Sequence, residues 1–426
     1  MLLAEGCAIG IDFGTTNSIV AVARPDGHVE CMTWPTNFGA TDTFRSALMF
    51  WREGRKLAHA AGPEAIERAV AGDRDHRFVQ SLKTHLASRL FAETRLFGQR
   101  LTIEELVTVF LRHLLDGLAP IAETLPVTGG RPVVFAGERA DERLALDRLA
   151  KSYAGAGLTQ IEFAYEPLGA AYWYARALER DETVLVADFG GGTSDFSIMR
   201  FFRKGDGIAA KALAHSGVGI AGDTFDYRII DHVVAPRLGK GTAYRSLEKL
   251  LPMPAYFYAA FAQWHQLSWL KSAQTLAELK SLAAASLAPN MIEDLVTIVE
   301  MDLGFELHRA VAGLKAELSF VERAHFRFEK SGVSIEAEVA RDDFDAWIAP
   351  DLGRLAATMD AAIEDAGLKA VDIDAVFMTG GTSFVPAVRR IFEERFAKPR
   401  IHIGDAFQSV ASGLALIAAD RARLAG

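Results

Sequence analysis

Short apolar runs alternate with polar turns along the chain, a pattern typical of proteins that mix strands and helices. The clearest example is TVLVADFGGGTSDFSIMR at residues 183–200, which predicts an apolar strand from Val184 to Ala187, a turn of three glycines and a second strand. An earlier stretch, AIGIDFGTTNSIV at residues 8–20, has the same order of strand, Asp-Phe-Gly, tight turn and strand. Two copies of one hairpin predict two similar half-molecules.

The turns of both hairpins have the chemistry of a phosphate site. The glycine turn from Gly190 to Gly192 lets backbone N–H groups approach an anion with no Cβ in the way. Asp188 and Asp195 flank that turn and are suited to holding a hydrated Mg²⁺. Asp12 has the matching place in the first hairpin. A single glycine-rich loop is most often a plain turn, but two such hairpins in order favour a nucleotide site.

Further strands are expected in the first half of the chain. Asp26-Gly27 separates two of them, at residues 19–23 and 28–33, as a hairpin turn does. Residues 46–51 and 131–136 have the same apolar, strand-like composition. The first half is therefore expected to contain a sheet built around the first hairpin.

Residues 57–118 are expected to turn helical. Thr102 and Glu105 form a capping box that opens a helix. Lys83 lies in the same region, and its spacing fits either a solvated lysine or a site residue. The apolar positions after the capping box have helical spacing and predict a buried stripe with no cofactor role: Ile103, Leu106, Val107, Phe110, Leu111, Leu114, Leu115 and Leu118.

Glu166 occupies a position where ligands often bind. A helix at residues 142–153 and a strand at 161–164 precede it, and Pro167 is suited to the first turn of the next helix. Glu166 therefore stands at the carboxyl end of a strand and just before a helix, the edge of an open α/β sheet that binds ligands. The alternative is an ordinary surface glutamate.

After the second hairpin, a strand at residues 209–216 leads through Gly219 to Asp223 into a helix at 224–234. Such a glycine-flanked helix start either binds an anion or ribose or simply turns the chain. Residues 236–310 are expected to form a helical insertion. It contains an aromatic segment that forms internal core or a partner-facing patch: Tyr256, Phe257, Tyr258, Phe261, Trp264 and Trp269.

The last third of the chain predicts another sheet strand and a third glycine turn. Lys330-Ser331-Gly332 joins two alternating strands, and residues 341–367 are mostly helix. The strand at 375–378 ends in the turn at 379–383, Thr-Gly-Gly-Thr-Ser, which is expected to open a helix at 384–396.

Composition narrows the possible partners. Of 426 residues, 50% are hydrophobic and 24% are charged, which fits a globular chain with a large core. The net charge of −9 argues against nucleic acid or an anionic membrane as a partner. Cys7 and Cys31 have no metal-site spacing and are expected to be reduced core residues of a cytoplasmic protein. No run of about 18 apolar residues is present, and the first ten residues do not resemble a signal peptide.

In order, the segments IGIDFGTTNSIV, YEPLGAA, DFGGGTSDFS, GDTFD, LKAELS and MTGGTSFVP, together with Lys83, resemble the heat-shock protein 70 (DnaK-type) ATPase domain, closest to YegD-type proteins. The resemblance implies an α/β, actin-like (ribonuclease H-like) ATPase fold with two lobes and a central nucleotide cleft. It implies lobe I at residues 1–180 with an outer subdomain at about 46–118. Lobe II follows at 181–400 with an outer subdomain at about 221–344, and a C-terminal helix at 401–426 returns to lobe I.

The resemblance also implies ATP or ADP with Mg²⁺ as the bound molecules. Asp12 and Asp188 would orient the metal through water, with Asp195 nearby, while Lys83 would reach the γ-phosphate and Glu166 would position the attacking water. The implied catalytic residues are Lys83, Glu166, Asp188, Thr193 and Asp195. The implied nucleotide-binding residues are Gly14, Thr15, Thr16, Asn17, Gly190, Gly191, Gly192, Thr193, Gly222, Asp223, Lys315, Ser319, Gly380, Gly381, Thr382 and Phe384.

Several positions depart from that family. Ala312 and Ala316 replace its Glu and Arg near the base, and Phe384 replaces a second Arg. Phe407-Gln408 replaces Asp-Glu, and Asn17 replaces an aromatic residue. These changes spare the phosphate chemistry and predict that the nucleotide is held mainly by its phosphates.

The expected function is slow Mg²⁺-dependent ATP hydrolysis that drives a conformational switch with an unknown protein partner. No interdomain linker or peptide-binding domain is expected after the last helix, so the chain alone is not expected to hold unfolded peptides. Two alternatives from the same superfamily are a small-molecule (sugar-type) kinase and a filament-forming actin-like ATPase. Phosphate release without added sugar and sedimentation with and without ATP would separate them.

Overall fold

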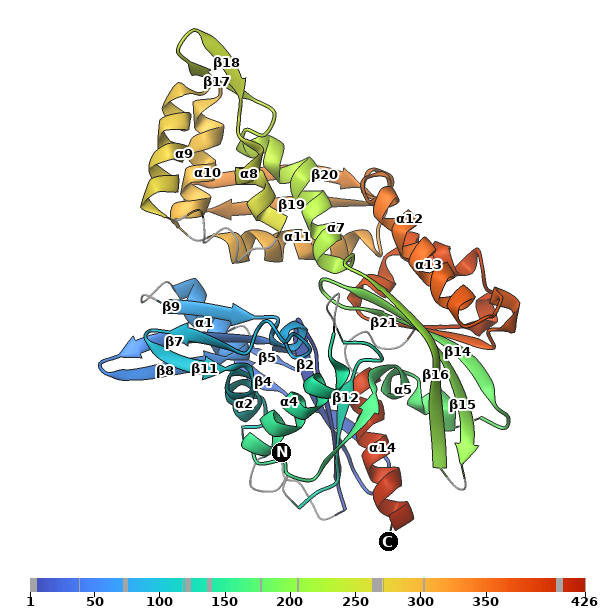
Figure 1. Ribbon diagram of the computed structural model, residues 1–426. Helices are drawn as coiled ribbons and strands as arrows, with labels where there is room; N and C mark the ends of the chain where they lie inside the picture. Colours follow the sequence, from blue (N-terminus) through green and yellow to red (C-terminus); the bar gives the residue numbers. More distant parts are fainter. Residues whose placement is uncertain are drawn as a thin grey trace. The chain divides into compact units, whose positions relative to one another are not determined.

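The structure is a computed structural model that describes residues 6–37, 39–71, 76–116, 118, 124–135, 140–176, 178–204, 207–262, 270, 272–301, 303–403 and 409–425. Packing divides the chain into two units (Figure 1). The first unit comprises Met1–Gly219, Ala357–Ser383 and Phe392–Gly426, and the second comprises Ile220–Ala356 and Phe384–Ile391. The expected lobe boundaries divide the chain differently and stay a prediction.

The first sheet of the first unit is built around the first hairpin. Strands β1 and β2 pair antiparallel, while β1 pairs parallel with β12 and β12 parallel with β13. The order across the sheet is β13-β12-β1-β2-β3, with β6 on the end of β2. The bounds are β1 Ala8–Phe13, β2 Asn17–Ala23, β3 Val29–Cys31, β6 Phe44–Arg45, β12 Val127–Arg131 and β13 Ile161–Tyr165.

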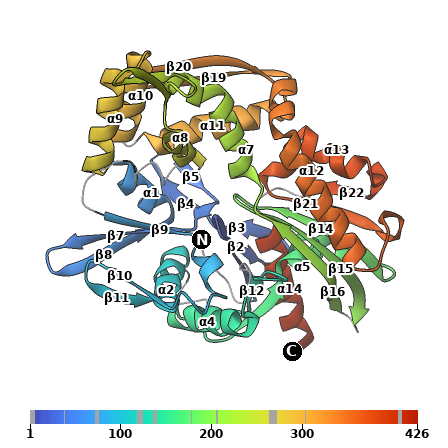
Figure 2. The ribbon, with the colours of Figure 1, turned by 45° about the horizontal axis from the view of Figure 1, so that its top comes forward.

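The second sheet of this unit repeats that plan around the second hairpin. Strands β14 and β15 pair antiparallel, and β14, β21 and β22 are parallel neighbours in the order β16-β15-β14-β21-β22 (Figure 2). In each sheet the two strands that come first along the chain form the hairpin. The two strands that come last along the chain continue the sheet in parallel from the first strand of that hairpin. The prediction of a repeated hairpin is therefore confirmed. The bounds are β14 Glu182–Phe189, β15 Ser194–Lys204, β16 Gly207–Val218, β21 Ala375–Thr379 and β22 Ile401–Ile403.

Helices α14 (Ser409–Ala425), α5 (Glu166–Ala170) and α6 (Tyr172–Arg176) pack against both sheets through one buried cluster. The cluster combines Ala21 of the first sheet, Val186 of the second and Leu414 of α14. Two glycines allow this close packing. A Cβ on Gly10 would lie 2.1 Å from the carbonyl oxygen of Ala411, and one on Gly413 would lie 1.9 Å from that of Gly169.

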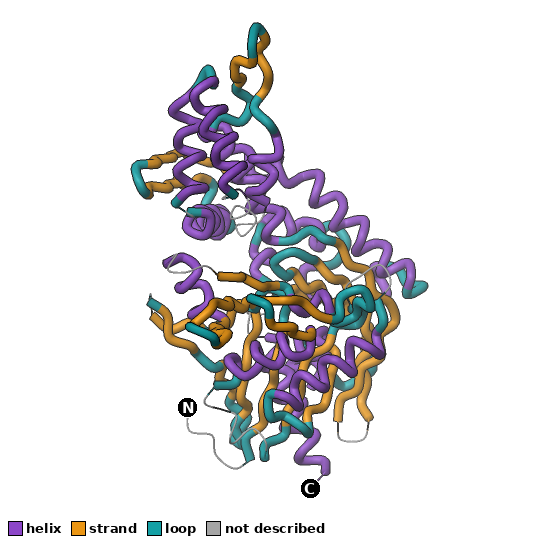
Figure 3. Tube along the Cα trace, turned by 60° about the vertical axis from the view of Figure 1, so that its left-hand side comes forward, coloured by secondary structure: helices purple, strands orange, loops and turns teal. Residues whose placement is uncertain are grey.

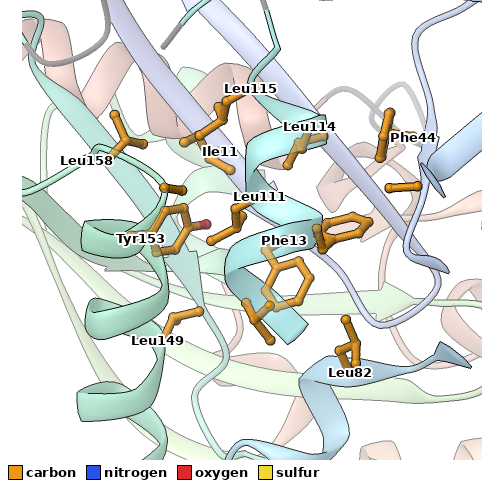
Figure 4. Packing of buried hydrophobic residues seen from close by; sticks show 14 of the residues in the cluster. Ile11, Phe13, Phe44, Leu82, Leu111, Leu114, Leu115, Leu149, Tyr153 and Leu158 are labelled. Atoms are coloured by element: carbon orange, nitrogen blue, oxygen red, sulfur yellow. The ribbon is translucent and has the colours of Figure 1, made fainter. Parts of the chain in front are cut away.

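The opposite face of the first sheet packs against α2 (Ile103–Leu114) and α4 (Glu142–Gly155) (Figure 4). The capping box predicted for α2 is present, since the Thr102 hydroxyl accepts from the Glu105 N–H and the Glu105 carboxylate accepts from the Thr102 N–H. All eight residues of the predicted apolar stripe are buried. These predictions are confirmed.

The prediction that residues 57–118 turn helical is wrong for most of that span. Before α2 it contains strands as well as the helix α1 and a short 3₁₀ helix, because β8 and β9 pair with β7 and so override the local helical pattern. The bounds are β4 Trp34–Thr36, β5 Gly39–Thr41, β7 Ala47–Glu53, β8 Lys56–Ala61, α1 Gly62–Ala71, β9 His76–Gln80, η1 Leu82–His85, β10 Glu93–Leu96 and β11 Gln99–Thr102.

The sequence predicts a strand at residues 131–136, but the strand in this region, β12, ends at Arg131. Strand β12 comprises VTGGR at Val127–Arg131, whose two glycines resemble a turn in the sequence. Both glycines lie in the strand, and glycine is needed there because the neighbouring residues leave no room for a side chain. A Cβ on Gly129 would lie 2.9 Å from Ile161 Cδ1.

The second unit combines helices with two hairpins. The predicted hairpin at Lys330–Gly332 is confirmed by β19 and β20, whose burial alternates. The bounds are α7 Gly222–Ile229, η2 Ile230–Val234, η3 Ala235–Leu238, β17 Ala243–Ser246, β18 Lys249–Pro252, α8 Ala255–Ala259, η4 Ala260–Ala262, α9 Ala273–Ala285, α10 Pro289–Glu300, α11 Gly304–Leu318, β19 Arg323–Lys330 and β20 Val333–Ala340. The remaining elements are α12 Arg341–Asp365, η6 Ala370–Asp372, η7 Gly381–Phe384, α13 Pro386–Glu393 and η8 Lys398–Arg400.

The described part of the insertion predicted at residues 236–310 contains several helices and the hairpin β17–β18, which extends beside α9 and α10 (Figure 3). Of its aromatic segment, Phe257, Tyr258 and Phe261 are buried and Tyr256 is exposed, so the described part is mainly core. Trp264, Trp269 and Phe407-Gln408 lie outside the described residues. No helix in the described ranges is long and apolar enough to span a membrane.

Candidate functional site

The turn of the first hairpin is held from outside by neighbouring strand residues. A Cβ on Gly14 would lie 2.1 Å from the carbonyl oxygen of Asn17, so only glycine fits this tight turn. The Ser46 hydroxyl donates to the Gly14 carbonyl at 2.7 Å, and the Ser46 N–H donates to the Thr16 carbonyl at 2.8 Å. Arg45 donates to the Asn17 amide oxygen at 3.4 Å. Thr15 and Thr16 are partly exposed at the tip.

The turn of the second hairpin lies close to the first. The Gly190 N–H donates to the Thr193 carbonyl at 2.9 Å, which closes the turn. A Cβ on Gly191 would lie 2.6 Å from Thr16 Oγ1, so the two turns approach each other where a side chain would not fit. Gly192 and Thr193 are exposed. The first unit thus brings both predicted phosphate turns together.

The third glycine turn packs onto the end of β14. Gly380 has φ +88°, and a Cβ there would lie 2.0 Å from the carbonyl oxygen of Phe189, so glycine is required for two reasons. Gly381 is exposed, but Thr382 is buried. The helix predicted at residues 384–396 is shorter than expected, since α13 begins at Pro386 and ends at Glu393.

Lys83 and Glu166 form an ion pair in the first unit. Lys83 Nζ donates to Glu166 Oε1 at 2.6 Å, and their side chains are only 10% and 12% exposed. As predicted, Glu166 begins the helix α5 directly after β13. Gly130 on the neighbouring strand makes room for it, because a Cβ there would lie 2.9 Å from Glu166 Cγ. Neither residue is therefore an ordinary solvated side chain.

Asp12 and Asp188 lie at the hairpin ends of the two sheets, within electrostatic reach of this pair. Asp188 is directly opposite Asp195 in the β14–β15 register. The pKa of Asp12 is raised to about 7, mainly by burial and secondly by the negative charge of Glu166, although the charge of Lys83 acts in the opposite direction. Burial, then the charges of Asp12, Asp195 and Glu166, raises the pKa of Asp188 to about 8. Burial and the neighbouring carboxylates therefore both oppose the ionisation of these two aspartates.

The carboxylates of the same cluster favour the charged form of Lys83. Burial lowers its pKa, but the charges of Glu166, Asp12 and Asp188 outweigh this effect, so the pKa is raised overall. The lysine therefore stays protonated at neutral pH and supplies a permanent positive charge beside the two turns.

Tyr153 lies behind the cluster. Its side chain is fully buried in the core under the first sheet (Figure 4), and its hydroxyl has no hydrogen-bond partner among the described residues. Burial, then the charges of Asp12 and Glu166, raises the pKa of its hydroxyl, which stays protonated. The site therefore also has a buried donor on its inner side.

These residues fit a hydrated magnesium ion. Among the described residues, no three acidic, histidine or cysteine side chains converge closely enough to ligate a metal directly. The prediction for Asp12 and Asp188 involves contact through water, as is common for Mg²⁺. Burial raises the pKa of both carboxyls, and the charge of Asp12 adds to the rise for Asp188, so a cation beside them would favour their ionised forms.

The residues predicted to surround the ribose and base on α7, on α11 and at Phe384 belong to the second unit. Lys315 Nζ donates to the Gly222 carbonyl at 3.1 Å and pairs with Asp226 at 2.8 Å. Asp223 lies in the first turn of α7, and Ser319 follows the end of α11. The guanidinium of Arg389 lies 5.5 Å from the centre of the Phe384 ring, while Ala312 is half-buried and Ala316 is exposed on α11.

Several residues that shape the site were not predicted. Ser46 and Arg45 hold the first turn, Gly130 makes room for Glu166, and the buried Tyr153 lies within electrostatic reach of Asp12 and Glu166. Only Gly130 had a sequence signal, the Gly-Gly pair at the end of a strand. The others depend on contacts across strands and layers that a linear pattern does not contain.

The raised carboxyl pKa values predict how stability depends on pH without metal or nucleotide. In the unfolded chain these carboxyls ionise near pH 4, so between pH 5.5 and 8 the folded chain holds protons that the unfolded chain has lost. The free energy of unfolding should therefore fall as pH rises through this window. One pKa unit equals about 1.4 kcal/mol, and partial exposure reduces the effect, so we expect a loss on the order of 2 kcal/mol.

Thermal unfolding from pH 5.5 to 8 checks this. Asp12→Asn should flatten the dependence, whereas the exposed Asp181→Asn should leave it unchanged. Stability of the metal-free wild type that is constant or rises toward pH 8 would contradict the electrostatic account.

Comparison with known families gives a match over two parts of the chain. A family model described as "Hsp70 protein" matches residues 146–244 and 301–421, which together exceed half of the chain. The match includes Glu166, the second hairpin and the third glycine turn, whereas the first hairpin and Lys83 lie outside it. The family comprises chaperone-type ATPases with an actin-like fold that bind ATP or ADP with Mg²⁺, and the mixed α/β architecture fits that fold. The chain belongs to the Hsp70 family.

Proposed function

We propose that this chain is a slow, Mg²⁺-dependent ATPase that works as a nucleotide-driven switch on a protein partner. The observation that carries the proposal is the Lys83–Glu166 pair, which lies with two raised-pKa aspartates beside two adjoining glycine turns. Phosphoryl transfer needs positioning and charge neutralisation more than covalent chemistry. This cluster contains both kinds of part.

The chain's own residues divide the work. The turns at Gly14 and Gly191 present backbone N–H groups to phosphate oxygens. Lys83 neutralises charge on the terminal phosphate and in doing so leaves Glu166, which is then available to orient and deprotonate the attacking water. Bound Mg²⁺, oriented through water by Asp12 and Asp188, supplies further charge neutralisation on the phosphates.

The same ion pair gives a physical reason for slow turnover. The 2.6 Å contact between Lys83 and Glu166 is nearly excluded from solvent, and each turnover has to separate it. Breaking such a pair leaves a poorly solvated charge until phosphate replaces the carboxylate. A slow hydrolytic step suits a switch, because the ATP state then lasts long enough for a partner to bind.

Within the family, we propose that the chain is of the YegD type, supported by the resemblance of its ordered motifs to that type. We also propose a cytoplasmic location, supported by the free cysteines Cys7 and Cys31. Activity assays on the purified chain under reducing and oxidising conditions test the second point. Dependence on an oxidised Cys7–Cys31 pair would contradict it.

Lys83→Ala tests the catalytic proposal. It should lower ATP turnover at least 100-fold, the effect of removing one charge-stabilising group, while leaving ATP affinity largely intact. Phosphate release at saturating MgATP measures this. The control is Lys280→Ala, which removes a surface lysine paired with Glu300 and should not change turnover. A wild type no faster than Lys83→Ala would show that the site does not hydrolyse ATP.

The Lys83→Ala variant also tests the switch, because it should hold ATP without hydrolysing it. Used as bait with ATP and with ADP, it should retain a partner in one nucleotide state and release it in the other. Equal retention in both states would contradict the switch.

The base is expected to contribute little to affinity. Ala316 and Phe384 replace two arginines that pack on adenine in the family that this chain resembles, and a stacked cation contributes ~0.5–2 kcal/mol. Their loss should weaken ATP binding roughly 10- to 100-fold, at about 1.4 kcal/mol per factor of ten. Phe384 can stack on a base but cannot distinguish adenine from guanine by hydrogen bonding.

Calorimetry with ATP and GTP measures this. Ala316→Arg should tighten ATP binding, whereas Ala310→Arg, on another face of α11, should not. Submicromolar binding of ATP by the wild type, with strong rejection of GTP, would disprove the expectation.

A further inference from the structure

A histidine lies beside the second hairpin in a group that the nucleotide site as described does not use. In the β15–β16 register, Asp195 is opposite Gly217 and Ser197 is opposite His215. Residues two apart on a strand, and residues directly opposite on an antiparallel neighbour, share one face of the sheet. His215 is therefore the diagonal neighbour of Asp195 on the face that carries it.

His215 contacts Asp195 with one nitrogen and Ser197 with the other. Its Nε2 lies 3.4 Å from Asp195 Oδ1, and its Nδ1 lies 3.1 Å from Ser197 Oγ. Ser197 is buried, and the His215 side chain is only 11% exposed. A neutral histidine has one N–H. Since a carboxylate accepts only, that proton belongs on Nε2, and Ser197 then donates its hydroxyl proton to Nδ1.

The other carboxylate oxygen of Asp195 is also held. Thr193 Oγ1 donates to Asp195 Oδ2 at 3.2 Å. Gly217 leaves the space that the carboxylate occupies, because a Cβ there would lie 2.7 Å from Asp195 Oδ1 and 3.7 Å from His215 Nε2. Thr193 and His215 thus contact the Asp195 carboxylate, and Gly217 leaves the space that it occupies.

Asp195 needs such support because burial does not fix it. Its side chain is 41% exposed, so without partners it would exchange among several rotamers. In its observed position it contributes to the electrostatic field at Asp188, which is directly opposite on β14. An ordinary core histidine would satisfy its own hydrogen bonds without facing an exposed carboxylate of the site.

We propose that His215 is a positioning residue that, with Ser197 behind it, holds the Asp195 carboxylate toward Asp188 and the bound metal and phosphates. The catalytic role of Asp195 in this inference rests on the proposed function. The orientation of the imidazole does not, because it follows from the contacts of His215 with Asp195 and Ser197.

The orientation is tested without metal, nucleotide or turnover. Nitrogen NMR of the metal-free protein, labelled at histidine with ¹⁵N, should show the proton of His215 on Nε2 and a lone pair on Nδ1. Ser197→Ala should shift the Nδ1 signal. A proton on Nδ1 in the wild type would overturn the proposal.

The effect on the site is tested with a pair of substitutions. His215→Ala should lower kcat about 10-fold with KM for ATP changed less than twofold, because the aligned fraction of Asp195 falls. His215→Gln keeps an N–H within reach of Asp195 and should recover most of the loss. Gly217→Ala should mimic His215→Ala by displacing Oδ1. The exposed His325→Ala serves as the control and should have no effect.

An Asp195→Asn background distinguishes positioning from general damage. There His215→Ala should cause no further loss of kcat, and thermal unfolding identifies any variant that fails to fold. Full additivity of the two changes, or equal loss in His215→Ala and His215→Gln, would overturn the proposal. If the wild type does not hydrolyse ATP, the proposed ATPase fails separately. The readout is then the Mg²⁺ concentration that half-maximally enhances ADP binding, which His215→Ala should raise and His215→Gln should restore.

Discussion

The burial of several carboxyl groups around one lysine is the constraint on which this site depends. Asp12, Asp188 and Glu166 gather near Lys83, and burial first, then the charges of neighbouring carboxylates, raises the pKa of both aspartates. A fold gains no stability from such an arrangement, since each charge would be better solvated in water. The arrangement would suit a hydrated cation and a polyphosphate, because the cation would balance the aspartates and the phosphate would compete with Glu166 for the lysine.

The repeated sheet produces this cluster from parts distant in sequence. Each sheet is built around a hairpin whose first strand has an aspartate as its next-to-last residue, Asp12 in β1 and Asp188 in β14. The two turns meet where Gly191 leaves room for Thr16. Helices α5 and α14 join both sheets through one core cluster, and the first residue of α5 is Glu166. Glycines at 10 and 413 let α14 approach closely enough to bind the sheets together. Packing therefore positions the charges, and the charges determine what the site can bind.

Local patterns predicted the local features of this molecule. The two hairpins, the capping box at Thr102 and the place of Glu166 at a helix start all follow from residues within a few positions of one another. The pattern failed for most of residues 57–102 outside α1, for example where β8 pairs with β7 although its alanine-rich sequence favours a helix. It also missed Gly130 and His215, because the first makes room for a side chain on another element and the second acts across a strand pair. Such features depend on the register of a sheet, which a single sequence does not display.

The central claim is that the two hairpins and their aspartates form one site for a metal–nucleotide complex. Electron paramagnetic resonance with Mn²⁺ in place of Mg²⁺ tests it most directly, because bound Mn²⁺ loses the sharp signal of the free ion. The wild type is expected to bind Mn²⁺ tightly only when ADP is present, and Asp12→Asn with Asp188→Asn should abolish this binding. Equal Mn²⁺ binding with and without ADP, or binding that survives the double substitution, would contradict it.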